Sequence, residues 1–108
     1  MAKRKVKEAV EFLERCLREG GVTPAKIILF GSQAKGKATK DSDIDVLIIS
    51  EDFRSKNILE RAAMTKDAEL KTLKKFMIPF DIVTLTPEEN NTSLIGAYAR
   101  AAEVVSAK

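Results

Sequence analysis

Three short apolar runs separated by helix-like stretches constrain the fold of this 108-residue chain more than any other feature. The runs are KIILF at residues 26–30, VLII within the segment DIDVLIIS at 43–50, and FDIVTL at 80–85. Runs of this length predict strands, and the unbroken run at 46–49 predicts a central strand that is buried on both faces. Helical segments lie between the strands, so the pattern predicts an α/β (α+β) fold with a three-stranded sheet covered by helices.

The first predicted helix spans residues 3–19 and ends at a glycine pair, Gly20-Gly21. Cys16, the only cysteine, falls beside the apolar stripe of this helix, where a buried packing residue is far commoner than a nucleophile. The stripe consists of Val6, Val10, Leu13 and Leu17.

The second predicted helix spans residues 57–77 and ends before Pro79. Its apolar residues fall on one side, and Lys66 interrupts them, so a break could occur there. We expect that side to face the core. It carries Ile58, Leu59, Ala62, Ala63, Leu70, Leu73, Phe76 and Met77.

The C-terminal part of the sequence predicts more helix. The segment TPEE has the pattern of a helix start, with Thr86 as N-cap and Glu89 closing a capping box. A last helix is expected from about Ser93 toward Ala107, and nine of the twelve residues at 94–105 are apolar. We therefore expect this helix to form a partner or homodimer surface.

Composition excludes several classes of chemistry. The chain has no histidine, which excludes a Ser-His-Asp triad and His-ligated zinc, so carboxylates must carry any acid, base or metal chemistry. The net charge of +3 is spread along the chain and predicts no direct nucleic-acid binding. Neither a signal peptide nor a membrane span is apparent, and we expect a cytoplasmic protein with one domain at residues 1–108.

Two familiar phosphate and metal motifs fit the segment at 29–49 poorly. Residues 31–37 read G-x-x-x-x-G-K, as in a P-loop, but Ala38 replaces the hydroxyl residue that would hold magnesium. Aspartates at 41, 43 and 45 match the first ligands of an EF-hand, but Val46 stands where the turn glycine must be. The alternation of Asp43 and Asp45 better fits two carboxylates on one face of a strand.

The third strand carries a matching acid. Asp81 lies near the start of FDIVTL, as Asp45 does in the second strand. If these two strands are parallel neighbours, Asp43, Asp45 and Asp81 converge at one edge of the sheet. Gly31 and Ser32 follow the end of the first strand, so they reach the same edge only if that strand is antiparallel to the second. The site itself therefore predicts a mixed sheet.

These residues resemble the minimal nucleotidyltransferase (MNT) family of the DNA polymerase β-like nucleotidyltransferase superfamily. The hallmark of that family is Gly-Ser, ten residues, then Asp-x-Asp, which Gly31-Ser32 and Asp43-Ile44-Asp45 match without a gap. The resemblance extends to the third acid and covers most of residues 25–86. One departure is Lys35, where the family commonly has an arginine.

The resemblance implies a magnesium-dependent nucleotidyltransferase that transfers AMP from ATP to a hydroxyl group. Asp43, Asp45 and Asp81 are then the catalytic carboxylates and hold two Mg²⁺ ions, which Mn²⁺ could replace. Asp81 also helps to deprotonate the incoming hydroxyl. Gly31 and Ser32 are expected to bind the β and γ phosphates of ATP. Lys35 and Lys37 are expected to add positive charge at those phosphates.

The partner follows from the same resemblance. Stand-alone members of the family act as antitoxins that pair with a HEPN-type ribonuclease toxin and adenylylate a tyrosine of that toxin. The chain is accordingly expected to be a protein adenylyltransferase of a toxin-antitoxin pair. Two alternatives remain open: a non-catalytic antitoxin or binding protein that neutralises its partner by contact, and nucleotidyl transfer to another acceptor such as an antibiotic.

Overall fold

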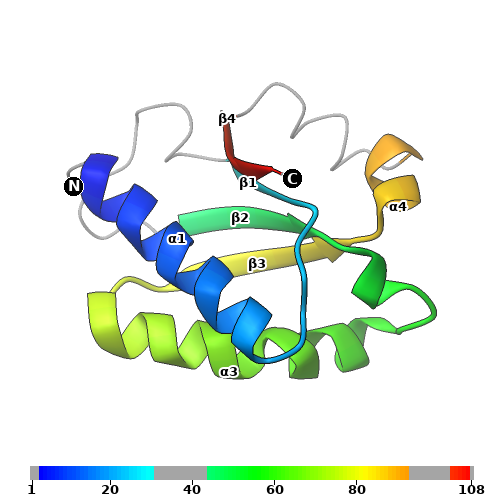
Figure 1. Cartoon of the computed structure of the whole chain (residues 1–108), viewed down its shortest axis with the longest axis horizontal. Coiled ribbons are helices and arrows are strands. Elements are labelled where there is room, and N and C mark those ends of the chain that lie inside the picture. The colour runs from blue at the N-terminus through cyan, green and yellow to red at the C-terminus, as the bar shows by residue number, and fades with distance from the viewer. Residues whose placement is uncertain (1–2, 31–43, 93–102, 108) are drawn as a thin grey trace.

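The computed structural model describes residues 3–30, 44–92 and 103–107, in which helices cover one face of a mixed sheet (Figure 1). The helices are α1 (Lys3–Glu19), the short 3-10 helix η1 (Glu51–Phe53), α3 (Ile58–Phe76) and α4 (Pro87–Thr92). The strands are β1 (Lys26–Phe30), β2 (Ile44–Ile49), β3 (Phe80–Leu85) and β4 (Glu103–Ala107). No described helix is long and apolar enough to cross a membrane.

The sheet has the strand order β3-β2-β1-β4, with β2 parallel to β3 and antiparallel to β1. The mixed sheet and both strand directions are as the sequence predicts. β2 lies between two neighbours and is buried at five of its six residues, as its unbroken apolar run predicts. Helix α3 connects β2 to β3, so the parallel pair forms a βαβ unit.

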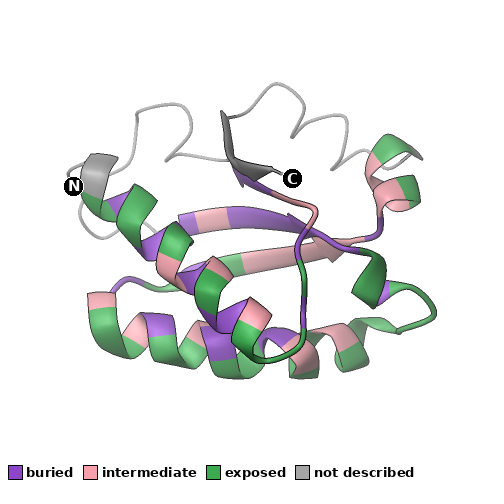
Figure 2. Cartoon of the chain, viewed as in Figure 1, coloured by how far each residue is buried: buried purple, intermediate pink, exposed green. Residues whose placement is uncertain are grey.

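Helix α1 buries the stripe predicted for it. Ala9, Val10 and Leu13 are fully buried, and the stripe packs with α3 and with one face of the sheet in a single core cluster (Figure 2). Cys16 belongs to this cluster, as predicted, and burial raises the pKa of its thiol, which disfavours the reactive thiolate. Gly21 has a positive φ of 95° where the chain leaves the helix, a conformation that glycine adopts easily.

Helix α3 buries only part of the face predicted for it, since Phe76 is half-buried and packs against the core cluster. Its buried residues are Thr65, Ala68 and Thr72, whereas Ile58 and Leu59 are 80% and 77% exposed. The buried threonines stay satisfied because their hydroxyls donate to backbone carbonyls of the preceding turn, as Thr72 does to Ala68 at 2.8 Å. The helix is continuous through Lys66, so the break considered there is wrong.

The predicted last helix is wrong at residues 103–107, which form β4, while residues 93–102 lie outside the described ranges. β4 pairs antiparallel with β1 and gives the sheet a fourth strand, with a register shift between Ile27 and Ile28. Val104 and Val105 are β-branched and suit a strand, and β1 supplies the partner that a local reading of the sequence does not show. A dimer surface based on one continuous C-terminal helix therefore loses its basis.

The predicted capping box at the start of α4 is confirmed. The backbone N–H of Glu89 donates to Oγ1 of Thr86 at 3.2 Å, and that of Thr86 donates to Oε1 of Glu89 at 2.9 Å. These bonds satisfy donors that a helix start otherwise leaves unpaired. They fix α4 directly behind the end of β3.

Candidate active site

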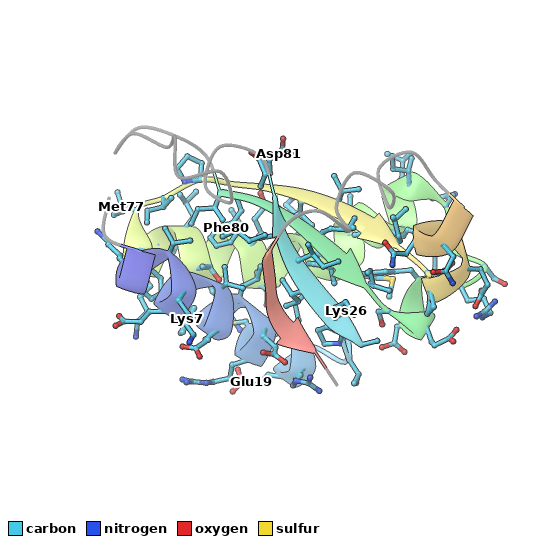
Figure 3. The ribbon with its side chains drawn as sticks, turned by 90° about the horizontal axis from the view of Figure 1, so that it is seen from above. Lys7, Glu19, Lys26, Met77, Phe80 and Asp81 are labelled. Atoms are coloured by element: carbon cyan, nitrogen blue, oxygen red, sulfur yellow. The ribbon has the colours of Figure 1, made fainter. Side chains whose placement is uncertain are left out.

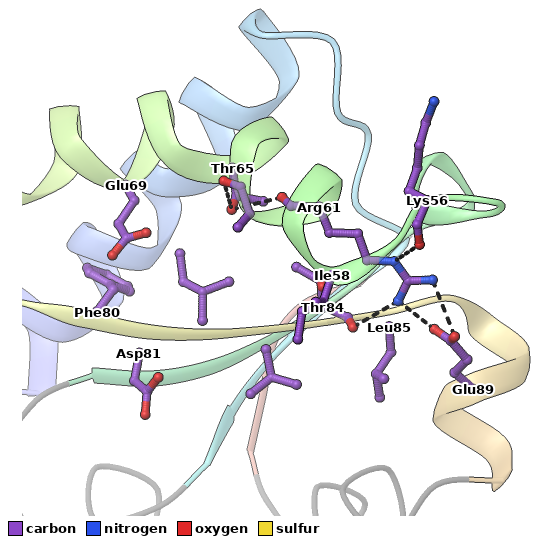
Figure 4. Close-up of a pocket in the computed structure, with 13 residues that line it drawn as sticks. Lys56, Ile58, Arg61, Thr65, Glu69, Phe80, Asp81, Thr84, Leu85 and Glu89 are labelled. Carbon is purple, nitrogen blue, oxygen red and sulfur yellow. Dashed lines mark hydrogen bonds and ion pairs between the residues drawn. The ribbon is translucent and has the colours of Figure 1, made fainter.

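Asp45 and Asp81 lie directly opposite each other on the parallel strands β2 and β3. Neighbouring strands are about 4.8 Å apart, and residues in register point to the same face, so the two carboxylates share one face of the sheet. Figure 4 shows Asp81 on the side of β3 away from α3. That face also carries a small apolar cluster of Ile28, Leu47 and Ile49.

The end of β1 lies at the same edge of the sheet. Phe30, its last residue, is in register with Asp45, whereas Lys26 at its start is in register with Ile49. Figure 3 accordingly shows Lys26 far from Asp81. The antiparallel direction that the sequence predicts for β1 is thus confirmed, and the chain leaves this strand beside Asp45.

The remaining predicted site residues lie outside the described ranges. They follow β1 or precede β2 in the sequence, and the structure neither joins them to the two aspartates nor separates them. These residues are Gly31, Ser32, Lys35, Lys37 and Asp43.

The described pair of carboxylates suits a hard divalent cation, because Mg²⁺ and Mn²⁺ prefer oxygen ligands and rarely need an all-protein cage. Within residues 3–30, 44–92 and 103–107, no three acidic or thiol side chains gather closely enough to hold a metal ion. The predicted third ligand, Asp43, is outside those ranges. Asp45 and Asp81, opposed on one face, therefore fit as two ligands of the expected site.

A groove of about 750 Å³ opens at Asp81 and runs along β3 beneath α3 (Figure 4). All six residues of β3 line it, together with residues from the first half of α3. One end is acidic, with Asp81 and Glu69, and the other is closed by Arg61 and Glu89. The middle is mainly apolar, with Ile58, Ala62, Phe80, Ile82, Val83 and Leu85.

Glu69 adds a carboxylate that sequence patterns do not single out. It lies on α3 above Phe80 and has no ion-pair partner in the part of the chain that the structure describes. Burial raises the pKa of its carboxyl, and the negative charge of Asp81 raises it further. The acidic end of the groove is therefore short of positive charge.

Arg61 fixes the opposite end of the groove. Its guanidinium forms a forked contact with Glu89, at 2.7 and 3.3 Å, and also donates to the carbonyl oxygens of Lys56 and Thr84. The bond from Arg61 lowers the pKa of Glu89, and the backbone N–H of Thr86 lowers it further. Helix α3, the end of β3 and the start of α4 are thus held together.

Sequence reasoning finds the aspartates but misses the groove, Glu69 and Arg61. The aspartates carry a local signal, since each precedes an apolar run. Glu69 and Arg61 are ordinary polar residues in a helical pattern, and only the packing of α3 against β3 brings them to one groove. The apolar pair Ile58-Leu59 is also a local signal, but it predicts a position facing the core, whereas both residues are exposed.

The model of the nucleotidyltransferase domain family matches residues 4–103 of the chain. A Methanocaldococcus jannaschii protein that carries the provisional name protein adenylyltransferase is 32% identical over 79 residues. That match covers 73% of this chain and 53% of the relative, so the chain spans about half the length of the curated protein it matches.

Two solved structures share the fold. A Sulfolobus solfataricus protein, provisionally named a nucleotidyltransferase, is 23% identical with a TM-score of 0.54, over 82% of this chain and 70% of its own. The structure of a toxin-antitoxin with AMP-PNP is 16% identical with a TM-score of 0.65, over 94% and 73% of the two chains. Both likenesses concern the fold alone.

Proposed function

Given that the chain belongs to the nucleotidyltransferase domain family, we propose that it transfers AMP from ATP to a hydroxyl group, with Asp43, Asp45 and Asp81 as its catalytic carboxylates. The observation that carries this proposal is the direct opposition of Asp45 and Asp81 on parallel strands. Two carboxylates opposed at this spacing on one face can share a divalent cation, which supports the expected metal site.

Three groups of residues divide the work. Gly31 and Ser32 bind the β and γ phosphates through backbone N–H groups and the serine hydroxyl, and Lys35 and Lys37 supply positive charge there. The aspartates would hold two divalent cations, Mg²⁺ by preference, and these ions would offset the charge of the triphosphate.

Asp81 is the residue placed to receive the proton of the acceptor. It is exposed and stands at the mouth of the groove, where an acceptor can approach from outside the sheet. The hydroxyl oxygen forms a bond to the α-phosphorus, the bond from that phosphorus to the bridging oxygen breaks, and pyrophosphate leaves. The proton of the hydroxyl passes to the Asp81 carboxylate.

We propose a protein as the acceptor, and a tyrosine of a HEPN-type ribonuclease toxin as the specific target, which makes the chain an antitoxin. The provisional name of the archaeal relative supports protein adenylylation, and the shared fold of the toxin-antitoxin structure solved with AMP-PNP supports the partner class. Action in the cytoplasm, where ATP is available, belongs to the same proposal.

The test is incubation of the chain with ATP, magnesium and the product of the neighbouring gene, followed by mass spectrometry for an added AMP. Asp81→Asn should reduce the transfer rate at least about a hundredfold, the usual scale for losing a general base, while ATP binding falls far less. Asp67→Asn is the matched control, because Asp67 is an exposed α3 aspartate that pairs with Lys71.

Equal losses of transfer and ATP binding in Asp81→Asn would remove Asp81 from the role of proton acceptor. Neutralisation of the partner by a chain that transfers nothing, with or without the aspartates, would instead establish the rival function of a non-catalytic binding protein.

A further inference from the structure

We infer that the acceptor docks as an extended strand on the edge of β3, with its hydroxyl residue opposite Asp81. This inference rests on the proposed function, since it concerns the segment that receives AMP. The groove along β3 would then bind a peptide with a defined alternation of side chains.

β3 is an edge strand in the described part of the sheet, because the order is β3-β2-β1-β4. The groove is lined by side chains from both faces of this strand: Phe80 and Ile82 belong to the helix-covered core, whereas Val83 and Leu85 pack on the opposite cluster. A groove bordered by both faces must run along the edge of the strand. That edge is the surface that an added strand uses.

The backbone of β3 offers hydrogen-bonding groups to this groove. The carbonyl of Pro79 accepts from Ile44 of β2, and that of Leu85 accepts from Ser50, directly after β2. Odd-numbered positions therefore direct their backbone groups inward, and the even-numbered ones, 80, 82 and 84, direct theirs outward. Arg61 covers the carbonyl of Thr84 at 3.3 Å. In the described part of the chain, the outward groups of Phe80 and Ile82 remain turned to the groove, and a peptide backbone would satisfy them.

The walls of the groove favour a peptide with alternating side chains. Ile58, 80% exposed, stands on the helix side of the groove with the small residue Ala62. Val83 and Leu85 are half-buried and lie on the same face of β3 as Asp81, two and four residues further along the strand. A hydroxyl residue opposite Asp81 therefore has an apolar residue two positions away facing Val83.

Charge at the acidic end adds a second preference. Residues next to the hydroxyl residue face the helix side, where Glu69 has no partner among the described residues. A lysine or arginine there would provide the missing positive charge. A tyrosine suits the central position better than a serine, because its longer side chain extends past Asp81 toward Asp45.

A peptide rather than a second copy of this chain fits the site. The β3 edge of a second copy reads FDIVTL, which brings another aspartate and no lysine or arginine to the acidic end of the groove. A separate strand can supply that positive charge. An antiparallel strand is the expected arrangement, since antiparallel pairing is the commoner and slightly more stable one.

The probe is a fluorescein-labelled peptide, Gly-Ser-Val-Lys-Tyr-Lys-Val-Ser-Gly, with the full chain and fluorescence anisotropy as the readout in the absence of ATP. N-methylation of both lysines removes the N–H groups that would pair with Phe80 and Ile82, and should weaken binding about tenfold or more. N-methylation of both valines changes groups that point away from β3 and should leave the Kd within about twofold.

Variants of the chain give an independent arm with matched controls. Ile58→Lys places a positive charge in the groove, where it repels the lysines of the probe, and should weaken peptide binding about tenfold, whereas Leu59→Lys, similarly exposed but outside the groove, should not. Ala62→Lys and Ala63→Lys form a second pair of the same design, since only Ala62 lines the groove.

Binding that ignores the positions of the N-methyl groups, or that responds equally to Ile58→Lys and Leu59→Lys, would overturn the inference. A dimer in light scattering that Ile58→Lys dissociates would also overturn it, because a second copy would then occupy the edge. Transfer to the tyrosine is measured separately by mass spectrometry. Patterned binding without transfer would reject the proposed chemistry and keep the docking, and transfer without the pattern would do the reverse.

Discussion

Helices α1 and α3 cover the same face of the sheet, yet they divide their apolar residues in opposite ways. On α1 the large apolar residues face the core, with Val10 and Leu13 fully buried. On α3 the buried positions are Thr65, Ala68 and Thr72. Met64 and Phe76 are half-buried against the core, whereas Ile58 and Leu59 stand in solvent. The first helix has the pattern of a packing element, and the second presents an apolar surface beside the candidate site.

The contrast supports the proposal that Ile58, the exposed apolar residue of α3 that lines the groove, serves recognition rather than folding. Ile58 and Leu59 are adjacent, at the start of the helix that borders the groove. Soluble proteins seldom expose neighbouring large apolar residues without an interaction that uses them. The core loses little by this, because the small residues and threonines of α3 allow close packing against α1 and the sheet.

The largest expected difference between the two helices is in the effect of replacing one leucine on each. Leu13→Ala removes a fully buried side chain from the core and should lower the free energy of unfolding by about 3 kcal/mol. Leu59→Ala changes a side chain that is 77% exposed and should stay within about 0.5 kcal/mol of the parent chain. Urea denaturation of the two variants decides the matter, and a large loss in Leu59→Ala would mean that this residue supports the fold.

A second test concerns the ion pairs at the ends of α3 and α4. The side chain of Arg61 is 13% exposed and that of Arg54 is 51% exposed, although each pairs with a glutamate of α4. Arg61→Met keeps the apolar stem and should lower the free energy of unfolding by on the order of 1 kcal/mol at pH 7, after allowance for screening of the exposed partner. Arg54→Met should cost much less.

The same pair predicts a pH dependence. Folding lowers the pKa of Glu89, so its stabilising contribution is present above the ordinary glutamate pKa of about 4.3 and is lost as the pH falls through the lower folded value. The difference between the parent chain and Arg61→Met should therefore shrink in urea titrations repeated at progressively lower pH below about 4. A difference that stays constant would assign the loss to packing and to the backbone bonds of Arg61.

Local signals account for the parts of the fold that the sequence predicts. The bounds of β1 and β3 match the apolar runs at 26–30 and 80–85, and the mixed strand directions follow from requiring one common site. The resemblance to nucleotidyltransferases is confirmed by the family match over residues 4–103. Within the site, the opposition of Asp45 and Asp81 agrees with the prediction, and the roles of the other residues stay predictions.

Nonlocal packing accounts for the parts that the sequence does not predict. The strand at 103–107 depends on pairing with β1, a partner about 75 residues earlier, and its alanine-rich approach suggests helix. The buried face of α3 depends on its packing against α1 and the sheet, which turns Ala68 inward and leaves Ile58 and Leu59 exposed. An apolar stripe therefore predicts a buried face only where its residues do not form part of an exposed binding surface.

The smallest change in the free energy of unfolding is expected for a substitution at Thr72. It tests whether the shape of the side chain or its hydroxyl determines which face of α3 is buried. Thr72→Val keeps the branched shape and removes the hydroxyl that donates to the carbonyl of Ala68. That carbonyl keeps its helical hydrogen bond, so no buried group is left unpaired and the free energy of unfolding should change by less than about 1 kcal/mol. Thr72→Ala, which also leaves a small void, should cost more. If urea denaturation shows the valine variant to be the more destabilised of the two, the hydroxyl rather than the shape determines which face of α3 turns inward.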